Sequence, residues 1–478
     1  MSNMGSVALV CFRRDLRLAD NPALRAAVDS GLELLPVFIW DAEFQEKLGS
    51  ASKWWLHHSL VSLKKSLNEM GSDLRIEVGQ SSAVLARLCR DFEVTQVIVN
   101  KRYEPDAIKD DLEVKKALPK SVSYIEFKGH LLWEPDEVRN LSGQPYKVYT
   151  AFWNAIQKLR PPAPVLPAPK KITSPLELFA KSKSVEDLKL LPTLPWDKNF
   201  YSEWTPGEHG AHKNLNAFNK KTITDYRESR NIPSVHGTSS LSPYMAWGEI
   251  SSRQIWHAVL KSKKGPYLSE GEKTYLKEIV WREFSHHLLF HFPFLVSKPL
   301  REEFLKFPWK KNEALLKKWQ RGQTGFPIVD AGMRELWHTG WMHNRVRMIV
   351  ASFLIKNLMI HWKSGAEWFW DTLVDADVPN NTLSWQWVAG CGVDASPFFR
   401  IFNPVLQGEK FDPNGDYVKK WCPELKGLPK NLVHTPSSVD AGVLAAAGVR
   451  LGDNYPKPCV DLKLSRDLAL QAFKELRK

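Results

Sequence analysis

The first part of the chain alternates between short apolar runs and longer stretches of helical periodicity. The short runs are rich in β-branched and aromatic residues, so the alternation predicts a doubly wound parallel five-stranded sheet over residues 1–135, with helices on both faces. No GxGxxG sequence follows any run, which excludes the dinucleotide fingerprint and leaves the carboxyl ends of the strands as the expected ligand site. The five expected strands are Ser6–Phe12, Leu32–Trp40, Leu74–Val78, Thr95–Asn100 and Val122–Phe127.

The rest of the pattern separates a proline-rich connection from a long helical region. Arg160–Lys171 holds five prolines in twelve residues, which predicts an extended linker, and we assign the whole connection to residues 136–202. From residue 203 to residue 478 the apolar spacing is helical, so we predict an all-helical second domain. Its clearest segments are Lys273–Phe292, Met333–Trp362 with a break at Gly340, Ala366–Ala376 and the tail Asp461–Lys478.

Composition adds a class of partner to this two-domain picture. The 478 residues include 66 Lys and Arg against 53 Asp and Glu, for a formal net charge of +13. A basic surface of this size suits a polyanion such as nucleic acid or an anionic membrane, although a basic soluble enzyme has the same composition. The chain also contains twenty tryptophans, which become dense in the helical region.

The spacing of the cysteines indicates whether a metal site or disulfides are expected, and the N-terminal sequence indicates whether the protein is secreted. The five cysteines are scattered and form no CxxC, so we expect no metal site and no disulfide framework, as in a reducing compartment. The N-terminus shows no secretory pattern, and the apolar run Met348–Ile355 is too short to span a membrane. We expect a soluble protein that is not secreted, cytoplasmic if bacterial and nuclear or organellar if eukaryotic.

The segment GTSSLSPYMAWGEIS (Gly237–Ser251) gathers hydroxyl groups just before a predicted helix. Pro243 suits the first helical turn, and Ser242 is expected to be the cap. Free N–H groups and the helix dipole favour an anion at such a position, so the loop is either a phosphate site or an ordinary cap.

Two helical segments place polar groups beside tryptophans. In WREFSHH, Glu278 and Trp281 share a helix face, and Arg282 lies four residues after Glu278. The face is either an ion pair beside a core indole or a carboxylate beside a stacking surface, which recognition of an extruded base needs. In GWMHNRVRM, Arg345 and Arg347 lie among apolar runs; a pair between Arg347 and Asp375 would avoid an unpaired buried guanidinium.

The segment NNTLSWQW (Asn380–Trp387) places two amides and two indoles directly after the acidic run VDAD. Adjacent amides are poor helix and strand formers, so the composition indicates either selection for chemistry or an ordinary segment of the core. Trp309, Trp362 and Trp385 form either an electron relay or part of the core.

Six segments, in order along the chain, resemble hallmark sequences of the photolyase/cryptochrome family. They are FRRDLRLADNPAL, GTSSLSPYMAWGEIS, WREF, TGFPIVDAGMREL, TGWMHNRVRM and FFRIFNPVLQGEKFD. The chain is most similar to the class I and class III cyclobutane pyrimidine dimer (CPD) photolyases, and its ASKWWLHHSL segment resembles the class III and plant-cryptochrome branch.

The resemblance implies an antenna-binding α/β domain, a long linker and a helical domain holding a folded FAD. It also implies that reduced, anionic FAD, excited by blue light, donates an electron to a CPD flipped out of DNA and that the electron returns after the ring splits. The handling of a flipped-out base is shared with other base-flipping enzymes. We expect a monomer that binds DNA containing CPDs.

The resemblance also implies roles for individual residues. FAD would be bound by Tyr226, Thr238, Ser239, Leu241, Ser242, Arg282, Asn344, Arg347, Asp375, Asp377 and Asn381. Asn381 would face the flavin N5, because an amide can accept from N5–H without supplying a proton. Glu278, Trp281, Met348, Asn381 and Trp387 would form the catalytic pocket, and Trp385, Trp362 and Trp309 would relay electrons. DNA contacts would come from Arg230, Glu278, Trp281, Asn344, Arg345, Trp387 and Gln407.

The chain departs from the family pattern at two places. Ser240 stands where many relatives carry arginine. In NKRYEPDAIKDD, Asp106 and Ala107 replace the class I folate contacts. We expect 5,10-methenyltetrahydrofolate as the antenna, with Glu104 as a contact; deazaflavin, another flavin and no antenna are the alternatives.

Three other functions compete with CPD repair. A cryptochrome-type photoreceptor has the same fold, but Asn381, Met348 and Glu278 argue against it. A (6-4) photolyase typically carries histidines where this chain has WMHNRVRM. A non-enzymatic binder of single-stranded nucleic acid would leave the hydroxyl-rich loop and the Arg–Asp set unexplained.

Overall fold

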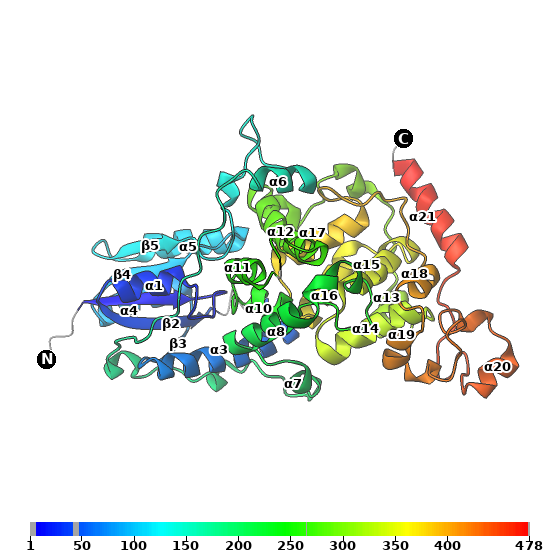
Figure 1. Ribbon diagram of the computed structural model, residues 1–478, viewed down its shortest axis with the longest axis horizontal. Helices are drawn as coiled ribbons and strands as arrows, with labels where there is room; N and C mark the ends of the chain where they lie inside the picture. Colours follow the sequence, from blue (N-terminus) through cyan, green and yellow to red (C-terminus); the bar gives the residue numbers. More distant parts are fainter. Residues whose placement is uncertain (1–5, 42–46, 264, 477–478) are drawn as a thin grey trace. The chain divides into compact units, whose positions relative to one another are not determined.

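The computed structural model describes residues 6–41, 47–263 and 265–476 (Figure 1). The chain divides into two compact units. Unit 1 comprises Met1–Lys221, Ser239–Pro293 and Val374–Asp377, and unit 2 comprises Thr222–Thr238, Phe294–Leu373 and Val378–Lys478. Each unit therefore combines segments that are distant in sequence. The two units are discontinuous, whereas the predicted domains are continuous stretches with boundaries at residues 135 and 202.

Unit 1 contains the predicted parallel sheet (Figure 1). All five predicted strands are confirmed, in the spatial order β3-β2-β1-β4-β5. Strand β1 pairs in parallel with β2, from Val7 opposite Glu33 to Phe12 opposite Phe38, and with β4 on its other side. The strands are β1 (Val7–Phe12), β2 (Glu33–Trp40), β3 (Arg75–Val78), β4 (Val94–Asn100) and β5 (Ser123–Phe127).

Both faces of the sheet are covered, as a doubly wound fold requires. On one face, alternate residues of β1 and β2 pack with α4 (Ser81–Asp91) and with Val114 of α5 (Pro105–Ala117). Helix α1 (Pro22–Asp29) contacts β1, β4 and β5. Every residue of β1 is buried, which explains why its sequence is continuously apolar rather than alternating.

The loop after β1 is held by buried polar contacts. Arg17 is 1% exposed and donates to the carbonyl oxygens of Gly248 (2.9 Å), Gly129 (2.7 Å) and Asp20 (2.8 Å). The Asp20 carboxylate in turn accepts from Ser251 Oγ (2.5 Å) and Arg253 Nε (3.0 Å). The loop thereby fixes the segment around Gly248 to the carboxyl edge of the sheet.

The remainder of unit 1 consists of helices and irregular connections. The residues of the proline-rich stretch 160–171 form no helix or strand, in agreement with the prediction, although helix α6 lies within the range assigned to the linker. Capping boxes at Ser251 and Ser269 begin α11 and α12. The longer helices outside the sheet layer are α3 (Ser50–Glu69), α6 (Tyr149–Ile156), α8 (Glu208–Lys221), α11 (Ser252–Ser262) and α12 (Glu270–His291), with the short α10 (Ser242–Ala246).

Unit 2 is built from helices, and the predicted break at Gly340 is confirmed by its left-handed backbone (φ 68°) at the end of α14. The helix predicted over Ala366–Ala376 ends earlier, at Thr372, because Leu373 is already extended and the following Val374–Asp377 belongs to a turn of unit 1. The principal helices are α13 (Glu313–Gln320), α14 (Pro327–Thr339), α15 (Asn344–Ser352), α16 (Trp362–Thr372), α17 (Val378–Ala389), α18 (Pro404–Phe411) and α21 (Leu462–Leu476). Within the described ranges, no helix has the length and apolar character needed to cross a membrane.

A buried carboxyl group in unit 1 predicts a pH-dependent stability. Glu249 is fully buried and accepts from the indole N–H of Trp55 (3.1 Å) and from Ser59 Oγ (2.5 Å). Burial raises the pKa of Glu249 to about 8, above the ordinary value of 4.5. Between these pH values the folded chain retains a proton that the unfolded chain releases, so the free energy of unfolding falls as pH rises.

We expect the Glu249→Gln variant to lose this contribution, so that its urea midpoint declines less than the wild-type midpoint across the same pH window. The exposed Glu69→Gln change on α3 serves as the control and should reproduce the wild-type profile. Equal pH profiles for wild type and Glu249→Gln would show that Glu249 is ionised in the folded protein.

Candidate functional site

The segment NNTLSWQW forms part of helix α17, despite the poor helix propensity of its amides. The half-buried Asn381 donates its side-chain N–H to the carbonyl oxygen of Ala366 on α16, at 3.0 Å. A carbonyl oxygen can only accept, so this contact fixes the orientation of the amide and leaves its Oδ1 available as an acceptor. Asn381 is thus prepared to accept a hydrogen bond from a ligand N–H group.

Trp385, one turn further along α17, lies in an aromatic cluster of unit 2. It is 2% exposed and meets Phe369 at 5.0 Å and Trp319 at 6.2 Å between ring centroids. Gly365 on α16 lies directly against the indole, where an added Cβ would collide with the ring. The close approach of α16 and α17 therefore depends on a residue without a side chain.

The other two predicted relay residues are linked through a histidine. The ring of His361 lies 5.5 Å from that of the buried Trp362 and 5.0 Å from that of the half-buried Trp309. Trp309 also contacts Phe307 at 4.4 Å. Unit 2 thus places Trp362 and Trp309 beside a common ring, with Trp309 the more exposed of the two.

The arginines of WMHNRVRM lie at the start of α15, where His343 is the N-cap. Arg345 donates to Asn231 Oδ1 (2.6 Å), lies over the ring of Phe411 (4.5 Å) and contacts Met348 Sδ (3.7 Å). This brings together two predicted pocket residues, Arg345 and Met348, with Asn231, which the sequence did not single out. A contact between segments 114 residues apart leaves no local signal in either segment.

The other predicted residues of unit 2 lie on α15, α17 and α18 and around Tyr226. Arg347 donates Nε–H to the carbonyl of Met342 (2.7 Å), and Asn344 is exposed at the first position of α15. Arg230 lies 5.5 Å over the buried ring of Tyr226. Gln407 on α18 and Trp387 on α17 are both half-buried.

The helix after the hydroxyl-rich loop begins one residue earlier than predicted. Ser242 is already helical, and the N-cap of α10 is Leu241, whose side chain has no capping oxygen. Ser240, which precedes it, adopts a left-handed backbone (φ 51°), a conformation uncommon for serine. Ser239 and Thr238 are half-buried, so both hydroxyl-bearing residues are partly open to solvent.

On helix α12, Glu278 and Trp281 are both half-buried, as their shared face predicts. The Trp281 indole is stacked on Tyr149 of α6, with centroids 3.6 Å apart and planes at 5°. The Tyr149 hydroxyl donates to the carbonyl of Lys277 (2.7 Å) and so fixes its ring to α12. Tyr149 was not predicted, because α6 lies in the range expected to be a linker.

Arg282, on the same helix, is bonded within unit 1. Its guanidinium donates to His130 Nε2 (2.7 Å) and to Ser252 Oγ (3.3 Å) and lies 3.5 Å from Glu283. Because arginine can only donate, His130 Nε2 must be the acceptor, and burial together with Arg282 holds the pKa of His130 well below its usual range. Arg282 is therefore part of a buried network.

The remaining predicted residues of unit 1 are carboxylates. Asp375 and Asp377 are buried in the turn Val374–Asp377. Glu104 is the N-cap of α5 and accepts from the backbone N–H of Tyr103 (3.2 Å). Burial opposes ionisation of Glu104, but His286, Arg14 and the nearby backbone N–H groups lower its pKa overall.

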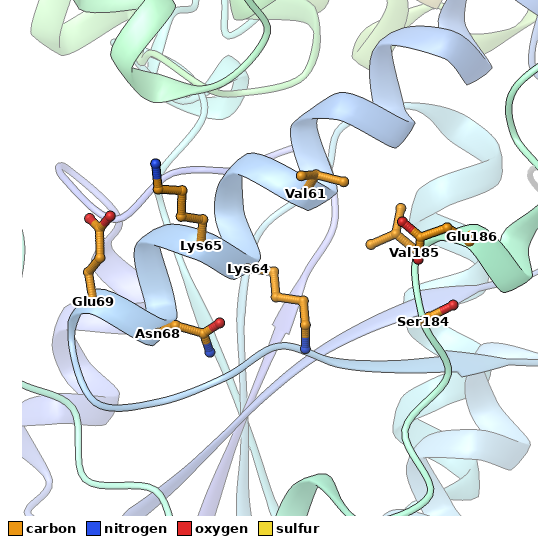
Figure 2. Close-up of a pocket in the computed structure, with 8 residues that line it drawn as sticks. All are labelled: Val61, Lys64, Lys65, Asn68, Glu69, Ser184, Val185 and Glu186. Atoms are coloured by element: carbon orange, nitrogen blue, oxygen red, sulfur yellow. The ribbon is translucent and has the colours of Figure 1, made fainter.

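The surface of unit 1 also carries a hollow (Figure 2). It has a volume of about 630 Å³ and is lined by one side of α3 and by Ser184–Glu186. Lys64, on its wall, is paired with Asp73 at 2.5 Å. None of the predicted site residues lines it, so it is a separate feature of the surface.

Comparisons with known proteins cover nearly the whole chain. Residues 8–170 match the family model described as DNA photolyase, and residues 275–475 match the FAD binding domain of DNA photolyase. A deoxyribodipyrimidine photo-lyase of Agrobacterium fabrum is 47% identical over 100% of both chains. Cryptochrome-2 of Arabidopsis thaliana is 38% identical over 99% of this chain and 80% of its own length. A crystal structure of a bacterial class III photolyase from Agrobacterium tumefaciens superposes with a TM-score of 0.94 at 46% identity, covering 100% of this chain and 99% of that one.

The contact between Gly365 and Trp385 generates a prediction. In the Gly365→Ala variant the new methyl group must displace the indole, which we expect to lower the free energy of unfolding by about 1–3 kcal/mol. Gly265→Ala is the control, because nothing lies within 4 Å of the added Cβ there. Urea denaturation of both variants measures the difference; equal stabilities would mean that α16 and α17 separate without cost.

Proposed function

This chain belongs to the photolyase/cryptochrome family, and on that premise we propose that it is a deoxyribodipyrimidine photo-lyase that splits CPDs in DNA under blue light. The observation that carries the proposal is the 47% identity to a photo-lyase over the full length of both chains, compared with 38% to a cryptochrome. The fixed amide of Asn381 is consistent with repair chemistry rather than with a site tuned for other flavin states.

FAD is the cofactor that the matched C-terminal family model specifies. The residues fit it: Asn381 offers an oriented acceptor for the flavin N5–H, and unit 2 supplies arginines for a negatively charged ligand. When bound, reduced anionic FAD supplies the light-excited electron that opens the cyclobutane ring. The chain's part is to orient the cofactor and to exclude water.

We assign the cofactor contacts of the sequence prediction to this chain. Arg347 would bind the isoalloxazine side together with Asp375 and Asp377. Tyr226, Thr238, Ser239, Leu241 and Ser242 would line the phosphate and ribityl side, and Arg282 and Asn344 complete the set. The left-handed Ser240 supports this assignment, because strained backbone is often retained at ligand sites.

The lesion would be recognised by a carboxylate and two indoles. Glu278 would accept from a pyrimidine N–H or, when protonated, donate to a carbonyl, while Trp281 and Trp387 cover the flat faces of the flipped bases. Met348 completes the pocket, and Arg345, Arg230, Asn344 and Gln407 would contact DNA at its rim. The net charge of +13 supports binding to the phosphates on either side.

Trp385, Trp362 and Trp309 would return electrons from the surface to an oxidised cofactor. Two observations support this: Trp385 lies in an aromatic cluster, and the ring of His361 lies beside both Trp362 and the partly exposed Trp309. We further propose 5,10-methenyltetrahydrofolate as an antenna with Glu104 as a contact, a monomeric state and an intracellular location.

The test is repair itself. The purified protein is photoreduced and mixed with an oligonucleotide carrying one thymine CPD, and the regain of thymine absorbance is followed under blue light and in the dark. Light-dependent recovery with turnover is the expected result. Absence of recovery from protein carrying fully reduced FAD would exclude CPD repair; the same assay with a (6-4) lesion then separates the remaining repair activity from a photoreceptor.

Removing the Glu278 carboxylate should impair lesion handling without loss of FAD. We expect Glu278→Ala to weaken binding of a CPD oligonucleotide about tenfold, the usual effect of losing one charge-assisted hydrogen bond. Binding is measured by fluorescence anisotropy, with Glu270→Ala on the same helix as the control. Unchanged binding and repair in Glu278→Ala would remove Glu278 from the lesion pocket.

Replacing the outer tryptophan should separate photoreduction from repair. Trp309→Phe removes the partly exposed indole, so photoreduction of oxidised FAD should fall at least about tenfold, whereas repair by chemically reduced protein stays at the wild-type rate. Trp421→Phe, a partly exposed indole paired with Lys420, is the control. Photoreduction at the wild-type rate in Trp309→Phe would rule out the proposed relay.

A further inference from the structure

The surface around Trp309 carries a lysine cluster that has no role in the function described so far. The segments 306–312 and 361–365, both in unit 2, contain no Asp or Glu and together hold four lysines: Lys306, Lys310, Lys311 and Lys363. We propose that this lysine cluster is a docking surface for a small anionic reductant that delivers one electron to Trp309. The inference rests on the proposed function, because Trp309 is there assigned as the outer end of the relay.

A backbone bond and a ring contact hold the two segments side by side. The N–H of Lys310 donates to the carbonyl of Met359 at 2.8 Å. The ring of Trp309 lies 5.0 Å from that of His361, with the planes at 62°. The lysines that follow Trp309 and the lysine that follows Trp362 therefore belong to one continuous patch.

The lysines keep their full charge at this surface. Lys306, Lys310 and Lys311 are exposed, and Lys363 is half-buried with its ammonium group 6.0 Å from the centroid of the Trp362 ring. Among the residues that the structure describes, none of the four forms an ion pair with a carboxylate. Lys310 and Lys311 directly follow Trp309 in sequence, so their ammonium groups contribute to the potential at the indole, which is screened over about 8–10 Å.

The histidine between the two indoles adds no charge of its own. His361 Nδ1 accepts from the backbone N–H of Lys363 at 3.0 Å. Burial, together with the positive charge of Lys363, lowers the pKa of His361 to about 4. At neutral pH the ring is therefore uncharged, and the lysines alone make this surface positive.

The indole of Trp309 is suited to receive an electron without a proton. Its ring is half-buried, so part of it is open to a solute. Its Nε1 is buried and, within the described ranges, has no hydrogen-bond acceptor. An indole that has lost an electron releases its N–H proton only to a base or to water, so oxidised Trp309 keeps the proton and a positive charge. A negatively charged donor is thus attracted by both the oxidised ring and the lysines.

The experiment compares an anionic and an uncharged donor, ascorbate and dithiothreitol, in the light-driven reduction of FAD-loaded protein. Ascorbate passes one electron to oxidised Trp309, becomes the ascorbyl radical and releases its proton to water, while Trp309 returns to the neutral indole. In Lys310→Gln/Lys311→Gln the second-order rate constant with ascorbate should fall about fivefold, whereas the rate with dithiothreitol stays at the wild-type value. Added salt should remove the difference between wild type and this variant.

A matched control removes the same charge elsewhere. Lys170→Gln/Lys171→Gln changes two adjacent exposed lysines of unit 1 and should match wild type with both donors. Because the two double variants have equal net charge, a difference between them reports the position of the lysines and not the overall charge of the protein.

Fluorescence quenching in the dark gives a second readout that involves no electron transfer to the cofactor. The contribution of Trp309 is the difference between each protein and the same protein carrying Trp309→Phe. Quenching of this contribution by iodide should be about threefold weaker in Lys310→Gln/Lys311→Gln, and quenching by the uncharged acrylamide should be unchanged.

Equal slowing with both donors, or no slowing with ascorbate, would overturn the proposal. Weaker binding of an undamaged oligonucleotide by Lys310→Gln/Lys311→Gln, with unchanged donor kinetics, would assign the lysines to DNA phosphates instead. Wild-type protein that carries FAD but is photoreduced with neither donor would contradict the relay of the proposed function, so the two failures are distinguishable.

Discussion

The buried guanidinium of Arg17 is the contact on which the arrangement of unit 1 depends. A buried arginine without partners would cost several kcal/mol, and Arg17 is satisfied entirely by backbone carbonyls from its own loop, from Gly129 and from Gly248. Those carbonyls come from parts of the chain more than one hundred residues apart. The guanidinium therefore joins the sheet edge to the segment around Gly248, and the bond between Asp20 and Ser251 is a second link between them.

The same loop forms polar contacts at the carboxyl edge of the sheet. In open parallel sheets a ligand binds where the strand order reverses, which here is between β1 and β4. Asn100 at the end of β4 donates to Asp15 (2.6 Å) and to Asn21 (2.8 Å), and Arg13 pairs with Asp111. Side chains of the loop after β1, of β4 and of α5 are therefore bonded to one another at this edge of the sheet.

Local pattern was enough to predict all five strands, the break at Gly340 and the proline-rich extended stretch, because each depends on near neighbours in sequence. Local pattern was insufficient where a contact between distant segments determines the ends or the stability of a helix. Helix α17 forms around the two amides because Asn381 bonds to α16 and Trp385 packs on Gly365, and α16 stops at Thr372 although its apolar spacing continues. In the candidate site, the family resemblance supplied Asn381, Trp281 and Trp385 as predictions, but the direction of the amide and the partner of Trp281 appear only in three dimensions.

The stacking of Trp281 on Tyr149 leaves only one face of the indole open to an approaching aromatic ring. One face of the indole is already covered at 3.6 Å, so an aromatic ring can meet Trp281 only from the opposite side. The indole can therefore stack on one ring but cannot intercalate between two stacked rings. An incoming ring must already be separated from its neighbour on the face that meets Trp281. The free energy needed to unstack such a ring must consequently come from contacts with other parts of the protein or from distortion already present in the ligand.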